Sequence, residues 1–215
     1  MSVLSAKRIQ ILQSGIRLQA VSLGWMLVEA GVSIVAGIAA GSLLLIAFGI
    51  DSVIELISAG VLYWRLRKEA DAQLTDAESV EAVERKASRI AGYLLYALSL
   101  YVVGQAIYGL VHRHQAQASW AGIAVALVAA FGMPVLARAK IRVADAIGSR
   151  AMRADAMETF TCGYLSWILL GGLIANVLHP WWWLDSTASL VLVPMLIKEA
   201  QESISGDCKC GKIRV

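Results

Sequence analysis

The sequence predicts an all-α membrane protein with six transmembrane helices. Of its 215 residues, 58% are hydrophobic and only 16% are charged, and the apolar residues form long runs rich in Ala and Leu. A soluble domain has roughly 45–50% apolar and about 25% charged residues. A membrane span takes roughly 20 apolar residues, so this composition supplies about six spans. Strands are not expected, because the runs show no alternation with a period of two.

The hydropathy pattern places the six helices in order along the chain. A very tight turn at Ala40-Gly41 joins the first two, and the charged stretch Arg65–Arg89 separates the second from the third. An amphipathic, salt-bridged cytoplasmic helix or a solvated linker would each explain that stretch. The expected helices cover Leu18–Ala39, Ser42–Trp64, Ile90–Val111, Trp120–Ala137, Thr159–Leu178 and Leu184–Ile197.

Residues beside the outer helix ends are expected to anchor the protein at the membrane interface or to cap a helix. The run Trp181-Trp182-Trp183 precedes the sixth helix and is typical of an interfacial aromatic anchor. Asp185 is expected to cap that helix, since an acid is favourable at a helix N-terminus. The histidines, at positions 112, 114 and 179, are expected to be solvent-exposed interfacial residues.

The distribution of basic residues orients the chain. If both termini are cytoplasmic, 18 of the 19 Lys and Arg residues lie on the cytoplasmic side and only Arg113 lies outside. We therefore expect a cytoplasmic N-terminal segment (1–17), a six-helix transmembrane unit (18–198) and a short cytoplasmic tail (199–215). The early charged residues indicate no cleavable signal peptide. The net charge of +3 is too small for a nucleic-acid-binding face.

Ionisable groups inside the apolar runs are the most informative residues. An unpaired carboxylate near the bilayer centre costs about 2.5–3.5 kcal/mol on insertion scales and usually marks a pathway or site. Asp51 and Glu55 stand four residues apart in the second helix, as do Glu158 and Cys162 at the start of the fifth. Each pair therefore shares a helix face. Three carboxylates and a thiolate can bind a divalent cation tetrahedrally.

Other readings of these residues stay open. Asp51 and Glu55 could be partly protonated and bonded to nearby serines, and Cys162 could be a small apolar filler. Glu29, in the first helix, could be an outer-sphere base, a proton carrier or a partner to a backbone group. Cys208 and Cys210 could form an accessory metal-capturing segment or an untethered, reduced tail.

At these residues the sequence resembles the cation diffusion facilitator family. Val35–Leu43 looks like that family's first helix, tight turn and start of the second helix, and Asp51 and Glu55 fall on its first metal pair. Ser149–Ala156 is similar to the approach to the fifth helix, which puts Glu158 and Cys162 on the second pair. Leu184-Asp185-Ser186 and the apolar run ending in Lys198-Glu199 look like the sixth helix. The resemblance covers roughly residues 18–200.

The resemblance implies a homodimer of six-helix protomers that exports a divalent metal from the cytoplasm, commonly against protons, and binds it between helices 2 and 5. We expect a bacterial inner-membrane location and no enzymatic activity, since neither a nucleophile–base pair nor a phosphate-binding glycine loop occurs. Two features depart from the family pattern. The site has no histidine, and only 17 residues follow Lys198, too few for the family's cytoplasmic domain.

The ligand types indicate which metals to expect. A thiolate favours zinc or cadmium, whereas carboxylates also suit manganese, iron(II) and cobalt, so Zn²⁺ is the first candidate. The metal is expected to enter past an acidic mouth near Asp155. Glu29 and Asp155 are both expected to couple protons or to support the metal ligands, with Glu29 as the extra proton carrier. Because ligands must be deprotonated to hold metal, metal and protons compete for the same groups. The alternatives are a proton-coupled exporter of organic cations and a non-transporting metal sensor or scaffold.

Overall fold

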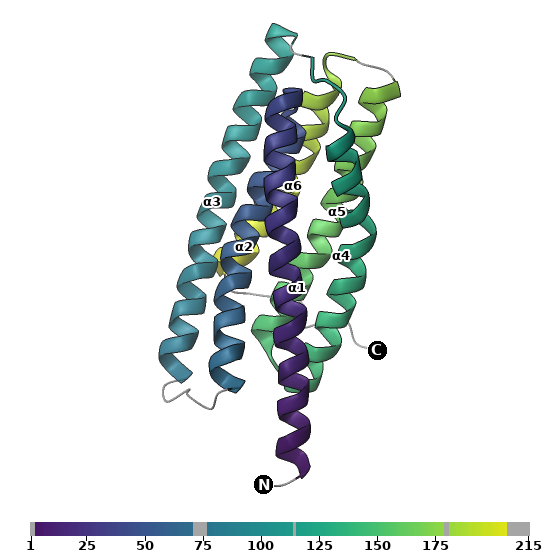
Figure 1. Ribbon diagram of the computed structural model, residues 1–215. Coiled ribbons are helices and arrows are strands. Elements are labelled where there is room, and N and C mark those ends of the chain that lie inside the picture. Colours follow the sequence, from purple (N-terminus) through teal and green to yellow (C-terminus); the bar gives the residue numbers. More distant parts are fainter. Residues whose placement is uncertain (1–2, 71–76, 114, 179–180, 206–215) are drawn as a thin grey trace, which may run out of the picture.

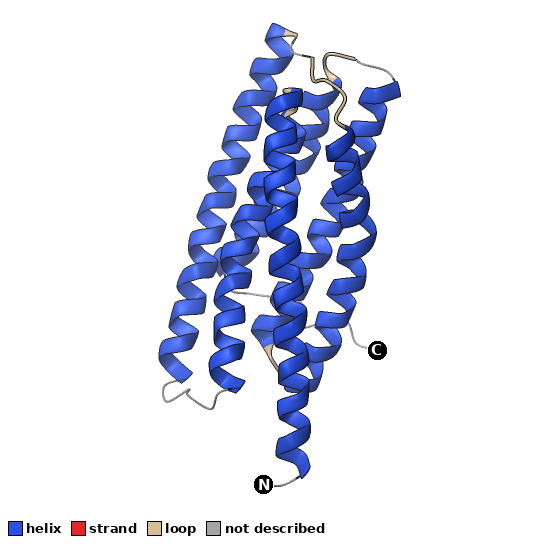
Figure 2. Cartoon of the chain, in the orientation of Figure 1, coloured by secondary structure: helices blue, strands red, loops and turns tan. Residues whose placement is uncertain are grey.

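The computed structural model describes residues 3–70, 77–113, 115–178 and 181–205, and within these ranges all regular structure is helical (Figure 2). This confirms the predicted all-α fold with six helices. They are α1 (Val3–Ala40), α2 (Leu43–Ala70), α3 (Ala77–His112), α4 (Trp120–Ile147), α5 (Arg150–Leu178) and α6 (Leu184–Ser205).

Five helices, α1 to α5, contain stretches long and apolar enough to cross a membrane. In α6, charged residues at both ends leave only the 12 uncharged residues of 186–197 between them. At about 1.5 Å per residue these span about 18 Å, less than the roughly 30 Å of a bilayer core. The chain is an integral, multi-pass membrane protein, and of the six described helices α6 is the one without such a long apolar stretch.

The helices pack as a ring of four with a pair beside it (Figure 1). The ring follows the contacts of α1 with α2 and α4, and of α5 with α4 and α2. Helix α3 packs along α6, and this pair contacts the ring through α2 and α5. Helix α2 thus touches four others, and any polar group that it turns inward can meet residues from several helices.

Most helices are longer than their apolar runs predict. Helix α1 begins at Val3 instead of Leu18, α2 continues to Ala70, and α3 already begins at Ala77. The stretch 65–89 is therefore largely a continuation of two helices, with 71–76 outside the described residues. Hydropathy marks the part of a helix that lipid can surround, whereas backbone hydrogen bonding continues through charged residues beyond it.

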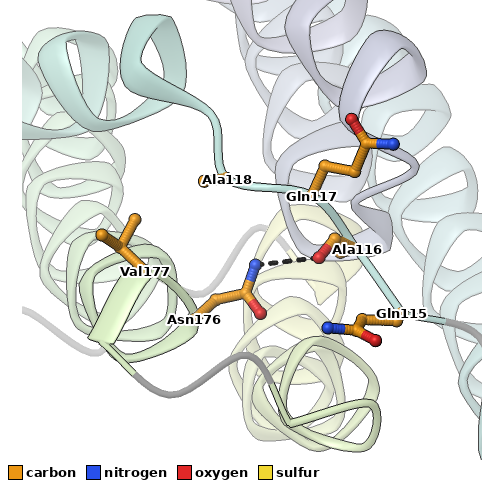
Figure 3. A pocket seen from close by; sticks show the side chains of 6 residues that line it. All are labelled: Gln115, Ala116, Gln117, Ala118, Asn176 and Val177. Carbon is orange, nitrogen blue, oxygen red and sulfur yellow. Dashed lines mark hydrogen bonds between the residues drawn. The ribbon is translucent and has the colours of Figure 1, made fainter.

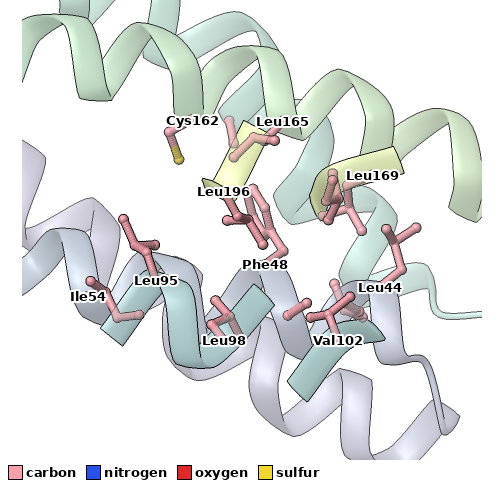
Figure 4. Packing of buried hydrophobic residues seen from close by; sticks show 14 of the residues in the cluster. Leu44, Phe48, Ile54, Leu95, Leu98, Val102, Cys162, Leu165, Leu169 and Leu196 are labelled. Atoms are coloured by element: carbon pink, nitrogen blue, oxygen red, sulfur yellow. The ribbon is translucent and has the colours of Figure 1, made fainter. Parts of the chain in front are cut away.

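The bundle carries apolar side chains on its outer surface and encloses both apolar and polar ones. Leu100, Val111 and Trp120 are 75%, 71% and 72% exposed, as expected of a surface in contact with lipid. Inside, Phe48 of α2 packs among leucines of α2, α5 and α6 (Figure 4). Cys162 belongs to the same buried cluster and is fully enclosed.

Glycines allow α1 and α2 to approach closely. A Cβ atom on Gly37 would lie 2.8 Å from Ile46 Cγ1 and 2.9 Å from the Ile46 backbone nitrogen. Gly41 makes the predicted tight turn between the two helices with a φ of 63°, a conformation that favours glycine. The two helices are thereby held in contact on both sides of the turn.

Asp185 joins the start of α6 to the start of α2. It lies in the first turn of α6, where the sequence predicts it to cap that helix, and its carboxylate bonds to the start of α2. Its Oδ1 accepts a hydrogen bond from Ser42 Oγ at 2.5 Å, and its Oδ2 accepts one from the Leu43 N–H at 2.8 Å. An acid at this position satisfies free N–H groups of α2 and complements the helix dipole.

We expect Gly37→Ala to lower the free energy of unfolding by about 1–3 kcal/mol, because the added methyl group meets backbone atoms of α2. Gly171→Ala is the matched control. It adds the same methyl group within a helix, at a position with no contacting atom within 4 Å, so stability should be unchanged or slightly raised. Thermal unfolding in detergent micelles measures both, and equal midpoints for the two variants would contradict the close approach.

Candidate metal site

Three buried acids from two helices form a compact group, called here the carboxylate cluster: Asp51 and Glu55 of α2 and Glu199 of α6. Each offers a carboxylate oxygen, and these atoms all lie within 4.8 Å of one another. The four-residue spacing on α2 places Asp51 and Glu55 on one face, as the sequence predicts. Glu199 comes from α6, which lies against that face.

The oxygens of the carboxylate cluster are short of partners. Both side-chain oxygens of Asp51, both of Glu55, and Oε2 of Glu199 are buried without a hydrogen-bond partner among the described residues. Buried polar groups are nearly always bonded, and an unbonded one carries a desolvation cost. Carboxylate oxygens with free lone pairs, converging from two helices, are the arrangement that a cation would complete.

The sequence did not single out Glu199. It stands between Lys198 and Glu202 at the polar end of α6, where charged residues ordinarily face solvent. The signal that could have found it is the buried face of α6. Ser189, Leu192, Leu196 and Ser203 are buried, and Glu199 continues their spacing of three and four residues.

The α5 half of the predicted ligand set lies beside the carboxylate cluster. Glu158 is half-buried and interacts electrostatically with Asp51 and Glu199. Cys162 is fully buried, and its Sγ lies 3.5 Å from Glu29 Oε1. The structure therefore places Glu158 near the carboxylate cluster and the Cys162 thiol in contact with Glu29. Metal ligation by either residue stays a prediction.

Glu29 reaches α2 and α5 with its side chain. Its Oε1 accepts hydrogen bonds from Ser52 Oγ at 3.0 Å and from the Cys162 thiol. The residue is fully buried, and its Oε2 has no partner among the described residues. Three roles are open for Glu29. Among the described residues its carboxylate bonds to side chains of the site, which does not support the role of a partner to a backbone group.

Asp155 is paired with a buried lysine of α4. Lys140 Nζ lies 2.7 Å from Asp155 Oδ2, 2.8 Å from Ser22 Oγ and 3.0 Å from Thr159 Oγ1. Gln19 of α1 donates to the other carboxylate oxygen at 2.8 Å. We call this group the Lys140–Asp155 network.

The Lys140–Asp155 network shows that one basic residue does not lie where the charge distribution predicts. The sequence assigns Lys140 to the cytoplasmic surface, but it is completely buried within α4. It follows Met133 and Ala137 on the buried face of that helix, so its ammonium group points inward. In the sequence Lys140 stands between Arg138 and Arg142, so its burial could not be predicted from the neighbouring residues.

The structure also describes a pocket and one of the predicted histidines. A pocket of about 420 Å³ at the loop 115–118 is lined by Gln115, Gln117, Asn176 and apolar residues, without an acid among its described lining residues (Figure 3). His112 is exposed and stacks on Tyr108, as expected for an interfacial residue. Four predicted residues lie outside the described part of the chain: His114, His179, Cys208 and Cys210.

Comparison with protein families matches residues 20–205 to the cation efflux transmembrane domain. The match begins in α1 and ends at the last described residue of α6, so it includes every residue of the carboxylate cluster. A comparison with curated proteins gave no significant match.

We expect Lys140→Met to destabilise the fold by about 3–5 kcal/mol, because it leaves Asp155 buried without its cation. Asp155→Asn combined with Lys140→Met should recover much of that loss, since both charges are then gone. The exposed pair Arg153–Asp145 is the control, and Arg153→Ala should cost at most about 1 kcal/mol. Unfolding in detergent measures these variants and Asp155→Asn alone, and additive effects of the two core substitutions would contradict the pairing.

Proposed function

Because this chain belongs to the cation efflux family and is therefore a membrane transporter of divalent metal cations, we propose that its carboxylate cluster binds the metal during export. The observation that carries the proposal is the convergence of Asp51, Glu55 and Glu199, whose side chains hold five buried oxygens without a partner among the described residues. Three carboxylates bring more negative charge than a divalent ion neutralises, so the site attracts cations in preference to neutral solutes.

The spacing of the oxygens suits a divalent metal. At metal–oxygen distances of about 2.0–2.2 Å, two oxygens on one ion lie at most about 4.4 Å apart. The oxygens of the cluster lie within 4.8 Å of one another, so small side-chain rotations would bring all three onto a single ion. We propose Zn²⁺ as the first candidate, with Cd²⁺, Co²⁺, Mn²⁺ and Fe²⁺ as others that carboxylates can hold.

Glu158 and Cys162 are proposed to complete the ligand set from α5. Glu158 already interacts electrostatically with two of the cluster residues, and a shift of α5 against α2 would bring its carboxylate closer. Such a relative shift of packed helices is the usual way in which a transporter exposes one site to each side in turn. We propose that this protein acts by the same alternating access, as a homodimer in the bacterial inner membrane.

Exchange with protons is proposed to drive export. The oxygens of the carboxylate cluster can hold either a metal or protons, and metal binding requires the deprotonated form. Glu29 contacts Ser52, the neighbour of Asp51, and is placed to pass protons to and from the site. Asp155 is held by Lys140, so it could take part at the cytoplasmic entrance only when that ion pair opens.

We expect Asp51→Asn and Glu199→Gln to weaken divalent-metal binding at least tenfold and to abolish metal flux in proteoliposomes, since each removes a charged ligand. Glu202→Gln is the matched control for Glu199, because it lies one turn further along α6 and is 50% exposed. It should retain wild-type binding and flux. Calorimetric titration with Zn²⁺ and Mn²⁺, followed by flux under a pH gradient, measures both properties.

The same experiment separates the alternative functions. Flux of a hydrophobic amine that metal does not inhibit, together with absent metal binding, would favour an organic-cation exporter. Metal binding without flux would favour a sensor or scaffold. Cys162→Ser should change the binding and flux of metal but leave the flux of the amine unchanged, because an organic cation has no need of a thiolate.

We also expect metal binding to release protons. In weakly buffered solution, Zn²⁺ added to the purified protein should acidify the medium, and the apparent Kd should rise as the pH falls. The rise is about tenfold per pH unit for each proton that one ion displaces. A pH-indicator dye and titrations at several pH values measure both effects. Binding without proton release and without pH dependence would exclude exchange at this site.

A further inference from the structure

Two arginines stand one turn apart on the outer face of α4, where that face changes from apolar to charged residues. Arg138 and Arg142 are both exposed, and their four-residue spacing places the two side chains next to each other. Phe131 and Val135, which precede them on the same face, are 58% and 65% exposed. We infer that this arginine pair binds the phosphate group of an anionic phospholipid, whose acyl chains lie against the apolar residues.

The direction of the arginine pair follows from the buried face of the same helix. Lys140 is completely buried and contacts Ser22 of α1 and Asp155 of α5. Successive residues of a helix are about 100° apart, so Arg138 and Arg142 each lie about 160° from Lys140 around the axis of α4. Helix α4 packs against α1 and α5 with its Lys140 side. The arginine pair therefore points away from the bundle, toward the membrane.

The arginine pair also lies at the depth of the lipid phosphates. Trp120 begins α4 and is 72% exposed, as is typical of an aromatic anchor at the opposite membrane surface. Arg138 follows it by 18 residues and Arg142 by 22, which at about 1.5 Å per residue places them about 27 and 33 Å further along the helix. Because a bilayer core is about 30 Å thick, the pair stands at its far boundary, the one that the basic residues predict to be cytoplasmic.

The two charges are not neutralised by the part of the chain that the structure describes. Neither Arg138 nor Arg142 has an ion pair or a hydrogen bond among the described residues. Asp145, the next acid on this face, is already paired with Arg153. Like charges one turn apart on a helix repel each other. A single anion between the two guanidinium groups would remove that repulsion.

A phospholipid fits this position better than a free anion does. A guanidinium group binds phosphate through two parallel N–H bonds, and two guanidinium groups can contact the oxygens of one phosphate from both sides. The apolar surface continues from Phe131 to Trp167 of α5, whose rings pack edge to face with centroids 4.8 Å apart. Acyl chains gain contact with this surface, and free phosphate has none to offer. A net negative headgroup is favoured, because the cationic group of a zwitterionic lipid is repelled by the pair.

Arg17 of α1 is a matched control at the same depth. A Cβ atom on Gly15 would lie 3.2 Å from Val143 Cγ1, so this part of α1 lies level with Arg142. Arg17 is exposed, and it lies about 160° from Gly15 around α1, on the side turned away from α4. No basic residue stands one turn before or after it, because positions 13, 14, 20 and 21 are Gln, Ser, Ala and Val. It offers the same charge without a second arginine.

The test uses the full chain, purified in a neutral detergent and titrated with dioleoyl phosphatidylglycerol or dioleoyl phosphatidylcholine. Native mass spectrometry reads the bound lipid. We expect the wild-type protein to prefer phosphatidylglycerol by at least about tenfold. Arg138→Gln and Arg142→Gln should each lower this preference about fivefold, and the double variant should abolish it. Arg17→Gln should change the preference less than twofold.

Thermal unfolding separates lost lipid binding from a lost fold. Since both arginines are exposed, the double variant should keep the wild-type midpoint without lipid. Phosphatidylglycerol should raise the midpoint of the wild type and of Arg17→Gln but not that of the double variant, because a ligand of the folded state stabilises it. If the double variant is unstable, the two single variants carry the test.

Three results would overturn the inference. The first is an unchanged lipid preference in the double variant, or in both single variants. The second is an equal loss of preference in Arg17→Gln, because any exposed charge at this depth would then suffice. The third is displacement of phosphatidylglycerol by excess inorganic phosphate, which would show that the pair recognises the anion without the lipid. We expect no displacement.

Discussion

The bundle encloses carboxylates that no buried protein cation balances, and the rest of the site depends on this imbalance. Glu29, Asp51, Glu55 and Glu199 are all buried, and Lys140 is the one buried base among the residues that the structure describes. Carboxylates within 4.8 Å of one another repel by about 3.5 kcal/mol or more for each ionised pair at an effective dielectric constant of about 20. A metal ion or protons would relieve that repulsion, which is the physical basis of the proposed exchange of one for the other.

The helix arrangement decides which acids can share an ion. Helix α2 carries Asp51 and Glu55 and contacts α1, α3, α5 and α6. Its position along α1 is set by the close approach at Gly37, and its N-terminus is tied to α6 through Asp185. These contacts bring the start of α2 and the start of α6 together, so the two helices run side by side and Glu199 meets the acids of α2.

Much of this could be predicted from sequence, because lipid imposes simple rules. Six helices, the turn at Gly41 and the pair Asp51/Glu55 follow from hydropathy, glycine and a four-residue spacing. Glu199 and Lys140 could not be found in the same way. Both stand in charged stretches at helix ends, where average composition indicates solvent, yet each lies on the buried face of its helix. Their orientation follows from the spacing of buried neighbours and from which helix lies opposite, and hydropathy reports neither.

A buried lysine close to an acidic cation site raises the question of why it does not occupy that site. An ammonium group has three hydrogens, and Lys140 has three acceptors: Asp155, Ser22 and Thr159. Its hydrogens are thereby fully used, and Gln19 satisfies the second oxygen of Asp155. Glu158, although it is nearby, is not one of the three acceptors of Lys140. Because Lys140 is fully engaged with its own acid, it leaves the carboxylate cluster open to the cation that we propose to bind there.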